Sequence, residues 1–237
     1  MKQVYKSRHH FRSHPTQSVA NLAAKIAGTA FVLFLSLPLA GRGQHTRKYD
    51  LSRLLVEKKL FINPRSTAKV LNDSTSEGVT CSGIVWVTGV NFSTGSIDID
   101  LKGRDVFQQS FLGIAFHGID SVTYDAIYFR PFNFQSPDSL RRKHMVQYIS
   151  QPDFPWDRLR KEHPLVYENT VNPPLVAKDR FHAHIIVTNE TITVYVNHSA
   201  TPSLTVRKLN NRTDGMIGLW DDGLPGDFSN LVITNNP

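Results

Sequence analysis

Short segments of alternating apolar and polar residues follow one another along most of the chain after residue 80. They are rich in valine, isoleucine, phenylalanine, tyrosine and threonine, and they are bounded by glycine, asparagine, aspartate or proline. A period of two predicts β-strands with one buried face, and the bounding residues predict turns. The predicted strands are Cys81–Val87, Gly95–Lys102, Ser110–His117, Tyr124–Arg130, His144–Ile149, Phe181–Val187, Thr191–Val196, Met216–Trp220 and Phe228–Ile233.

These strands predict an all-β fold, a two-sheet antiparallel jelly-roll sandwich over residues 78–237. Residues 44–77 form an expected N-terminal extension, with a short helical turn at Leu51–Leu55 and a first strand near Leu60. Residues 151–180 form a long connection, in which Pro155 and the helix formers after it predict one short helix. A connection of this length in a compact domain is typical of a functional loop.

The first 43 residues predict an export signal. A basic stretch precedes an apolar run of 15 residues, Ile26–Ala40, which is short for a membrane span of about 20 residues. Gly41 and Gly43 follow, so we expect cleavage after Gly43 and no stable membrane span in the mature protein. The alternative is an uncleaved N-terminal anchor. Both predict a domain outside the cytoplasm, secreted or periplasmic.

The charge of the chain is unevenly placed. The chain has 27 Lys+Arg against 20 Asp+Glu and a formal net charge of +7, which would suit a nucleic-acid or membrane-surface binder. However, the first 43 residues carry six of the basic residues and no acidic residue, so the remainder is about neutral. Nucleic-acid binding therefore loses its electrostatic support. The single cysteine, Cys81, excludes an internal disulfide and a thiolate zinc site.

Strand alternation also indicates which polar groups share a face. Tyr128 and Arg130 lie together on one face, and the same argument places His117 with Gly113 and Ala115. Aromatic rings stack on the C–H faces of pyranoses, and planar polar groups pair with their hydroxyls. Alternatively, these aromatic residues pack in the core and the arginines pair with acids. The predicted saccharide-binding residues are Tyr128, Arg130, Asn133, Gln147, Tyr148, Trp156 and Trp220.

Catalysis is left open by the sequence. His117 is the leading candidate for a general acid or base, because its ordinary pKa lies near neutrality, and Asp125 is a candidate partner carboxylate. An enzyme with this site would be a glycoside hydrolase or lyase. No serine-nucleophile elbow, phosphate loop or dinucleotide fingerprint is present in the sequence.

Three further groups of residues have two interpretations each. His182 and His184 have a spacing compatible with a metal site, but no third ligand is evident, so no metal site is predicted. Asp98 and Asp100 share a strand face, either as a glycosidase pair or as an ordinary solvated face. The third group could supply oxygen ligands to calcium, bond sugar hydroxyls or serve as turn residues. It consists of Asp221, Asp222 and Asp227, and apart from calcium we expect no cofactor.

Several of these segments resemble the concanavalin A-like lectin/glucanase superfamily, in particular its laminin-G-like and bacterial keto-disaccharide-hydrolase-like members. The resemblance covers about residues 78–234 and implies a jelly roll whose concave face and rim loops bind carbohydrate. The glucanase branch carries a Glu-x-Asp-x-x-Glu strand, and Ile97–Lys102 lacks both glutamates, so its retaining mechanism is not transferred. The segments that carry the resemblance are Phe111–Gly118, Thr123–Phe134, Arg141–Tyr148, Gly215–Trp220 and Gly226–Leu231.

Two functions follow as competing hypotheses. The first is an exported domain that binds a saccharide or glycan and could process it. The second is a non-catalytic interaction module of the laminin-G kind, which binds a protein or a cell-surface partner. Aromatic residues gathered on one concave face would favour the first, and aromatic residues scattered over loops would favour the second.

Overall fold

The computed structural model describes residues 43–72 and 77–236. The expected export signal therefore lies outside the described residues, except for Gly43. No helix within the described ranges is long and apolar enough to cross a membrane. In chain order the elements are β1 His45–Tyr49, α1 Leu51–Val56, β2 Leu60–Ile62, β3 Thr67–Val70, β4 Gly78–Phe92, β5 Thr94–Lys102, β6 Ser110–Gly118, β7 Tyr124–Phe129, the 3-10 helix η1 Pro131–Asn133, α2 Ser139–Arg142, β8 Val146–Gln151, α3 Trp156–Glu162, β9 Glu168–Asn169, β10 Phe181–Val187, β11 Thr191–Val196, β12 Leu204–Arg207 and β13 Gly215–Asn236.

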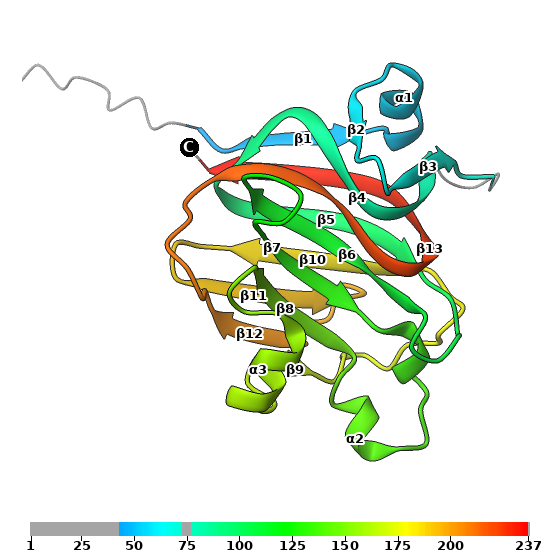
Figure 1. Ribbon diagram of the computed structural model, residues 1–237, viewed down its shortest axis with the longest axis vertical. Helices are drawn as coiled ribbons and strands as arrows, with labels where there is room; N and C mark the ends of the chain where they lie inside the picture. Colours follow the sequence, from blue (N-terminus) through cyan, green and yellow to red (C-terminus); the bar gives the residue numbers. More distant parts are fainter. Residues whose placement is uncertain (1–42, 73–76, 237) are drawn as a thin grey trace, which may run out of the picture. The chain divides into compact units, whose positions relative to one another are not determined.

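The long strand β13 belongs to both sheets of the sandwich (Figure 1). Its residues 216–223 pair with β6, and its residues 227–236 pair with β5. The pairing of β13 with β4 shifts register between these two parts, where the strand changes sheet. One sheet continues through β6, β7, β8 and β9, and the other through β5, β10, β11 and β12, with antiparallel pairing throughout. The predicted all-β, two-sheet antiparallel jelly-roll sandwich is confirmed.

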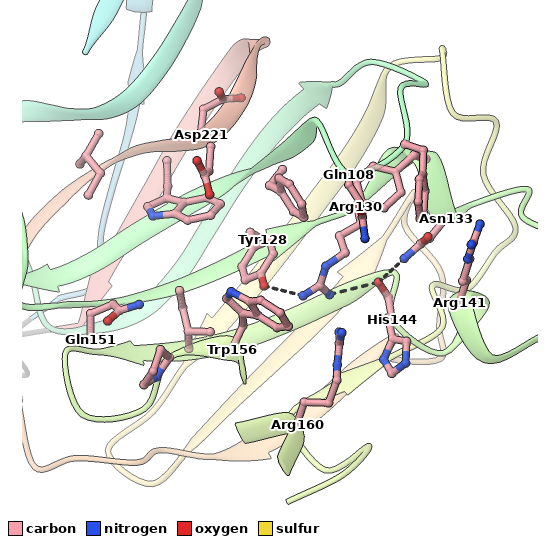
Figure 2. A pocket seen from close by; sticks show the side chains of 18 of the residues that line it. Gln108, Tyr128, Arg130, Asn133, Arg141, His144, Gln151, Trp156, Arg160 and Asp221 are labelled. Carbon is pink, nitrogen blue, oxygen red and sulfur yellow. Dashed lines mark hydrogen bonds between the residues drawn. The ribbon is translucent and has the colours of Figure 1, made fainter. Parts of the chain in front are cut away.

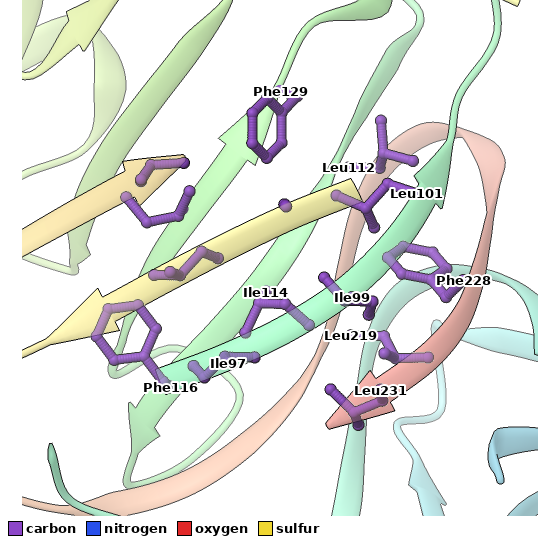
Figure 3. Close-up of a cluster of buried hydrophobic side chains, with 14 of the residues drawn as sticks. Ile97, Ile99, Leu101, Leu112, Ile114, Phe116, Phe129, Leu219, Phe228 and Leu231 are labelled. Atoms are coloured by element: carbon purple, nitrogen blue, oxygen red, sulfur yellow. The ribbon is translucent and has the colours of Figure 1, made fainter. Parts of the chain in front are cut away.

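The main core lies between the two sheets (Figure 3). On β5 the side chains of Ile97, Ile99 and Leu101 are fully buried, while the residues between them are partly exposed. This is the burial pattern that a period of two produces in a strand with one covered face. The neighbouring part of β13 contributes Phe228 and Leu231, and the facing sheet contributes Leu112, Ile114, Phe116, Phe129 and Leu219, all fully buried.

The sheet that contains β6, β7 and β8 is also covered on its other face. A second apolar cluster forms there, and every residue of β7 is buried. Tyr128 and Trp220 belong to this cluster, together with Leu159 of α3, which is 1% exposed. The long connection after β8 therefore packs its helix onto the sheet, as the sequence predicts for a segment with a short helix. A cavity also lies on this second face.

The N-terminal extension packs against the edge of the sandwich. Strand β1 pairs with the later part of β13, and β2 and β3 pair with β4. The predicted helical turn is found as α1, and the strand predicted near Leu60 is found as β2, but it is not the first strand because β1 precedes it. Leu51 of α1 and Leu60 of β2 are buried in the main core.

Candidate functional site

A cavity of about 730 Å³ lies on the face of β6, β7 and β8 that is turned away from the main core. Side chains from η1, α2, α3 and the first part of β13 complete its walls (Figure 2). Its aromatic lining consists of Phe107, Phe111, Tyr124, Tyr128, Phe132, Trp156 and Trp220. Its polar lining consists of Gln108, Arg130, Asn133, Arg141, His144, Gln151, Arg160, Asp221 and Asp222.

The aromatic side chains of the cavity fall into a buried floor and an exposed rim. The rings of Tyr128 and Trp220 lie 4.8 Å apart between centroids, and both side chains are nearly buried. The Trp220 Nε1–H donates a hydrogen bond of 3.1 Å to the Tyr124 hydroxyl, which holds the indole in place. Trp156, the first residue of α3, is 48% exposed and has the Arg160 guanidinium 5.1 Å above its ring. Phe107 is 47% exposed, so Trp156 and Phe107 are the lining aromatic residues most open to a bound molecule.

A buried polar network lies behind this floor. The Arg130 guanidinium donates to the Tyr128 hydroxyl at 2.6 Å, to Gln147 Oε1 and to the His144 carbonyl at 3.1 Å. The Tyr128 hydroxyl in turn donates to Gln147 Oε1 at 2.8 Å. Burial raises the pKa of Tyr128 to about 12, so its hydroxyl keeps its proton at neutral pH. Arg130 is 4% exposed, and most of its donors serve the protein itself.

The carboxylate of Glu168, in β9, neutralises part of the positive charge of Arg130. Its carboxylate accepts two hydrogen bonds from Arg160, at 3.0 and 2.7 Å, and lies 2.8 Å from His144 Nδ1 and 3.7 Å from Arg130 Nη1. The side chain of Glu168 is only 2% exposed. Buried carboxylates are stable when they are paired and hydrogen-bonded in this way. Glu168 therefore fixes the positions of the surrounding guanidinium groups.

The structure brings most of the predicted saccharide-binding residues together. Tyr128, Arg130, Asn133, Trp156 and Trp220 all line the cavity. Gln147 lies directly behind them through its hydrogen bonds to two of these residues. Tyr148 does not line the cavity, because alternation on β8 turns its side chain to the main core, where its hydroxyl donates to Asp125 at 2.8 Å.

His117 and Asp125 are placed inside the protein, away from the cavity. Both side chains are 0% exposed, and His117 Nδ1 lies 3.4 Å from Asp125 Oδ2. The expectation that His117 shares a face with Gly113 and Ala115 is wrong. Strand β6 has one extra residue opposite β13 near this point, and His117 has a φ of 49°. This β-bulge turns the imidazole inward, where it stacks on Phe92 with ring centroids 5.9 Å apart.

The two histidines of β10 are hydrogen-bonded to the two aspartates of β5. His182 Nδ1 lies 2.8 Å from Asp100, and His184 Nδ1 lies 2.7 Å from Asp98. The register of the strands places each histidine directly opposite its aspartate. The hydrogen bonds of His182 to Asp100 and, through Nε2 at 3.2 Å, to Asp98 raise the pKa of His182 to about 9. The pairs form a surface network and are not part of the cavity.

Asp221, Asp222 and Asp227 lie within strand β13, and they do not converge. Asp227 is bound by Arg104, at 3.0 and 2.9 Å, and by the Thr80 hydroxyl at 2.8 Å. Asp221 is buried at the cavity wall, and Asp222 is exposed there. Among the described residues there is no group of three or more His, Cys, Asp or Glu side chains that could hold a metal ion.

Sequence reasoning missed several lining residues, among them four polar side chains. They lie on α2, on α3 and at the ends of strands, where no alternating pattern indicates a shared face. Only the packing of the two short helices beside the sheet brings these side chains into one cavity with Tyr128. They are Arg141, His144, Gln151 and Arg160.

Comparison with known proteins identifies the fold class. No protein-family model and no curated protein sequence matches the chain. A crystal structure of a protein of unknown function with a galectin-like fold from Bacillus subtilis is 11% identical, with a TM-score of 0.53 over 80% of this chain and 94% of that chain. A putative glycosyl hydrolase from Parabacteroides distasonis is 15% identical, with a TM-score of 0.49 over 80% and 99%. The carbohydrate-binding module CBM66 from Bacillus subtilis is 11% identical, with a TM-score of 0.48 over 70% and 92%.

The first of these similarities defines the class. The chain has a galectin-like antiparallel β-sandwich fold, of the lectin-like kind that the sequence resemblance implied. At this level of identity the likeness concerns the fold alone, because one fold supports many unrelated functions. Function must therefore be argued from the cavity itself.

Proposed function

We propose that this domain binds a saccharide in the cavity, and that residues 1–43 direct its export. The observation that carries the proposal is the composition of the cavity, in which an exposed indole and a floor of aromatic rings adjoin arginine, asparagine and carboxylate side chains. A volume of about 730 Å³ lies within the range of about 300–1,000 Å³ that small-molecule sites occupy. We also propose membership of the concanavalin A-like lectin/glucanase superfamily, which the fold and the sequence segments support.

Each side chain has a physical role in the proposed complex. Trp156 offers its open ring to the C–H face of a pyranose, because an aromatic face attracts polarised C–H groups and releases water. Trp220 and Tyr128 form the floor beneath the sugar. Asn133 and Asp222 are planar polar partners for its hydroxyl groups.

The distribution of aromatic side chains favours a saccharide over a protein partner. Seven aromatic residues converge on one cavity. A flat protein interface would instead spread such residues over a larger surface. The catalytic role of His117 and Asp125 stays a prediction, and the proposed binding does not depend on it, because both side chains are fully buried.

The test is a glycan array followed by titration calorimetry with the full-length protein and its Trp156→Ala variant. Phe61→Ala is the matched control, because Phe61 of β2 is an aromatic residue that is 57% exposed and lies outside the cavity lining. We expect the wild type and the control to bind the same glycan, and Trp156→Ala to bind it at least about tenfold more weakly. A blank array for the wild type, or equal affinity in Trp156→Ala, would refute the proposal.

Arg130→Ala is a poor test of binding. Its guanidinium donates to Tyr128, Gln147 and the backbone, so its loss would leave buried acceptors without donors. The variant would lose affinity through a distorted cavity even if Arg130 never touched a ligand. Trp156 avoids this problem, because its side chain is half exposed.

A further inference from the structure

The basic and acidic side chains of the cavity lie at opposite ends. Among the residues that line it in the described part of the chain, three are arginines and two are aspartates. In Figure 2, Arg141, His144 and Arg160 lie on one side of Trp156, and Asp221 lies on the other. A ligand held across Trp156 would therefore meet guanidinium groups at one end only.

The positive end has more guanidinium charge than the carboxylate behind it can neutralise. Glu168 is shared between Arg160, at 2.7 Å, and Arg130, at 3.7 Å. One carboxylate thus faces two permanent cations. Desolvation lowers the pKa of His144, so at neutral pH its imidazole adds no further positive charge. The net positive charge at this end of the cavity therefore comes from the arginine side chains.

Arg141 adds a third cation from α2. Its guanidinium lies 4.2 Å above the ring of Phe107, which also lines the cavity, so stacking holds it at the wall. Its carboxylate partner Asp138 is 3.5 Å away, with both side chains about half exposed. A pair this exposed is weakly coupled, because water screens it. The same carboxylate also accepts a 2.8 Å hydrogen bond from Leu140 N at the start of α2.

The positive end is open to a solute, next to the exposed indole. The side chain of Arg160 is 35% exposed and that of Arg141 is 48% exposed. The Arg160 guanidinium lies over the ring of Trp156, so the positions for a sugar ring and for an anion adjoin each other. Planar guanidinium groups bind carboxylate and sulfate through paired N–H donors.

We propose that the ligand is an anionic saccharide, whose carboxylate or sulfate group binds between Arg141 and Arg160 while its ring stacks on Trp156. This inference rests on the proposed function and specifies its substrate class. At the opposite end the exposed Asp222 carboxylate repels a second anion, and Asp221, which burial keeps protonated at neutral pH, favours hydroxyl groups instead. The cavity therefore also sets the direction in which an oligosaccharide lies.

The experiment compares matched pairs of ligands. An array carries neutral oligosaccharides, uronic-acid oligosaccharides with their carboxyl-reduced counterparts, and sulfated oligosaccharides with their desulfated counterparts. The full-length wild type is compared with Arg141→Gln and with the control Arg158→Gln. Arg158 also lies on the rim helix α3, but it pairs with Glu162 at 2.9 Å, stacks on Phe154 and does not line the cavity.

We expect an anionic member to bind at least about tenfold more tightly than its neutral counterpart, with an affinity that falls as salt rises. Arg141→Gln should lower this affinity about three- to tenfold and leave that for the neutral counterpart unchanged, and Arg158→Gln should change neither. A preference for the uronic-acid or for the sulfated pair identifies which anion the arginines take.

Equal or tighter binding of the neutral counterparts would overturn the anionic ligand while leaving the proposed saccharide site in place. Equal losses in Arg141→Gln and Arg158→Gln would overturn the assignment of the anion to the cavity. An array that is blank for every saccharide would overturn both this inference and the proposed function.

Discussion

Replacing Asp221 by asparagine is expected to stabilise the protein at alkaline pH. The side chain of Asp221 is 3% exposed, and neither carboxyl oxygen has a hydrogen-bond partner within the described residues. The Gly226 N–H approaches it without the alignment of a full hydrogen bond. Burial in this position raises the pKa of Asp221 from 3.8 to about 8. The folded protein therefore favours the protonated carboxyl group.

The size of the effect follows from this pKa difference. Each unit corresponds to about 1.4 kcal/mol, so a rise from 3.8 to about 8 corresponds to at most about 6 kcal/mol. Relaxation and water penetration reduce such values, and we expect about 2–4 kcal/mol. Because the folded pKa is the higher one, this contribution to stability is fully present below pH 3.8 and is lost as the pH rises through about 8. Asparagine is neutral at every pH and avoids the loss.

The assay is urea unfolding, followed by tryptophan fluorescence, at about pH 5, 7 and 9. The free energy of unfolding of Asp221→Asn minus that of the wild type should increase with pH by about 2–4 kcal/mol and level off above about pH 8. Asp222→Asn is the matched control, because its neighbouring carboxyl group is exposed and its difference should stay flat. A difference for Asp221→Asn that is the same at acid and alkaline pH would refute the reasoning.

Two further predictions concern buried and surface charge. Hydrogen bonding to Asp100 raises the pKa of His182 from 6.5 to about 9, so the wild type gains stability that is fully present below about pH 6.5 and is lost as the pH rises through about 9. His182→Gln should therefore lower the free energy of unfolding by about 1–3 kcal/mol near pH 6. An equal loss near pH 10 would contradict this prediction. Arg130→Met should lower the free energy of unfolding by about 3 kcal/mol or more, because it removes donors from a buried network that includes Glu168. The control Arg158→Met removes an exposed ion pair and should change the free energy of unfolding by less than about 0.5 kcal/mol. Similar values for the two variants in urea unfolding would refute this prediction.

Strand alternation proved a sound guide where one face of a strand is covered. On β5 the period of two correctly separates Ile97, Ile99 and Leu101 from the aspartates between them. The physical reason is that an extended backbone sends successive side chains to opposite faces, whatever its neighbours are. The same rule places Tyr128 and Arg130 on one face, and both line the cavity.

Alternation failed where the backbone departs from the regular strand. At His117 the bulge inserts one residue and reverses the face of the side chain. The sequence has no local signal for this change, because the bulge depends on how β6 pairs with β13. The alternating pattern predicts that the His117 side chain lies in the saccharide site, but the bulge places it in the interior of the protein.

Strand register also lay beyond the sequence. His182 and Asp100 are hydrogen-bonded, although 82 positions separate them in the chain. Sequence reasoning treated the two histidines as candidate metal ligands and the two aspartates as a candidate glycosidase pair. Their pairing across β5 and β10 satisfies both groups at once, because each imidazole contacts a carboxylate.

The amino-acid sequence by itself determined the fold class, the position of the longer strands, the inward face of most of them and the uneven placement of charge, because these depend on local period and composition. It missed the short strands β1, β3, β9 and β12, which depend on pairing with distant partners. Tertiary structure alone decided which residues form the cavity. Arg141 and Arg160 come from short helices in connections, and they line the same cavity as Tyr128 only because these segments pack beside the sheet. The polarity of the cavity depends on that packing, since it lets Arg130 and Arg160 share the buried Glu168 carboxylate and brings Arg141 to the same end of the cavity.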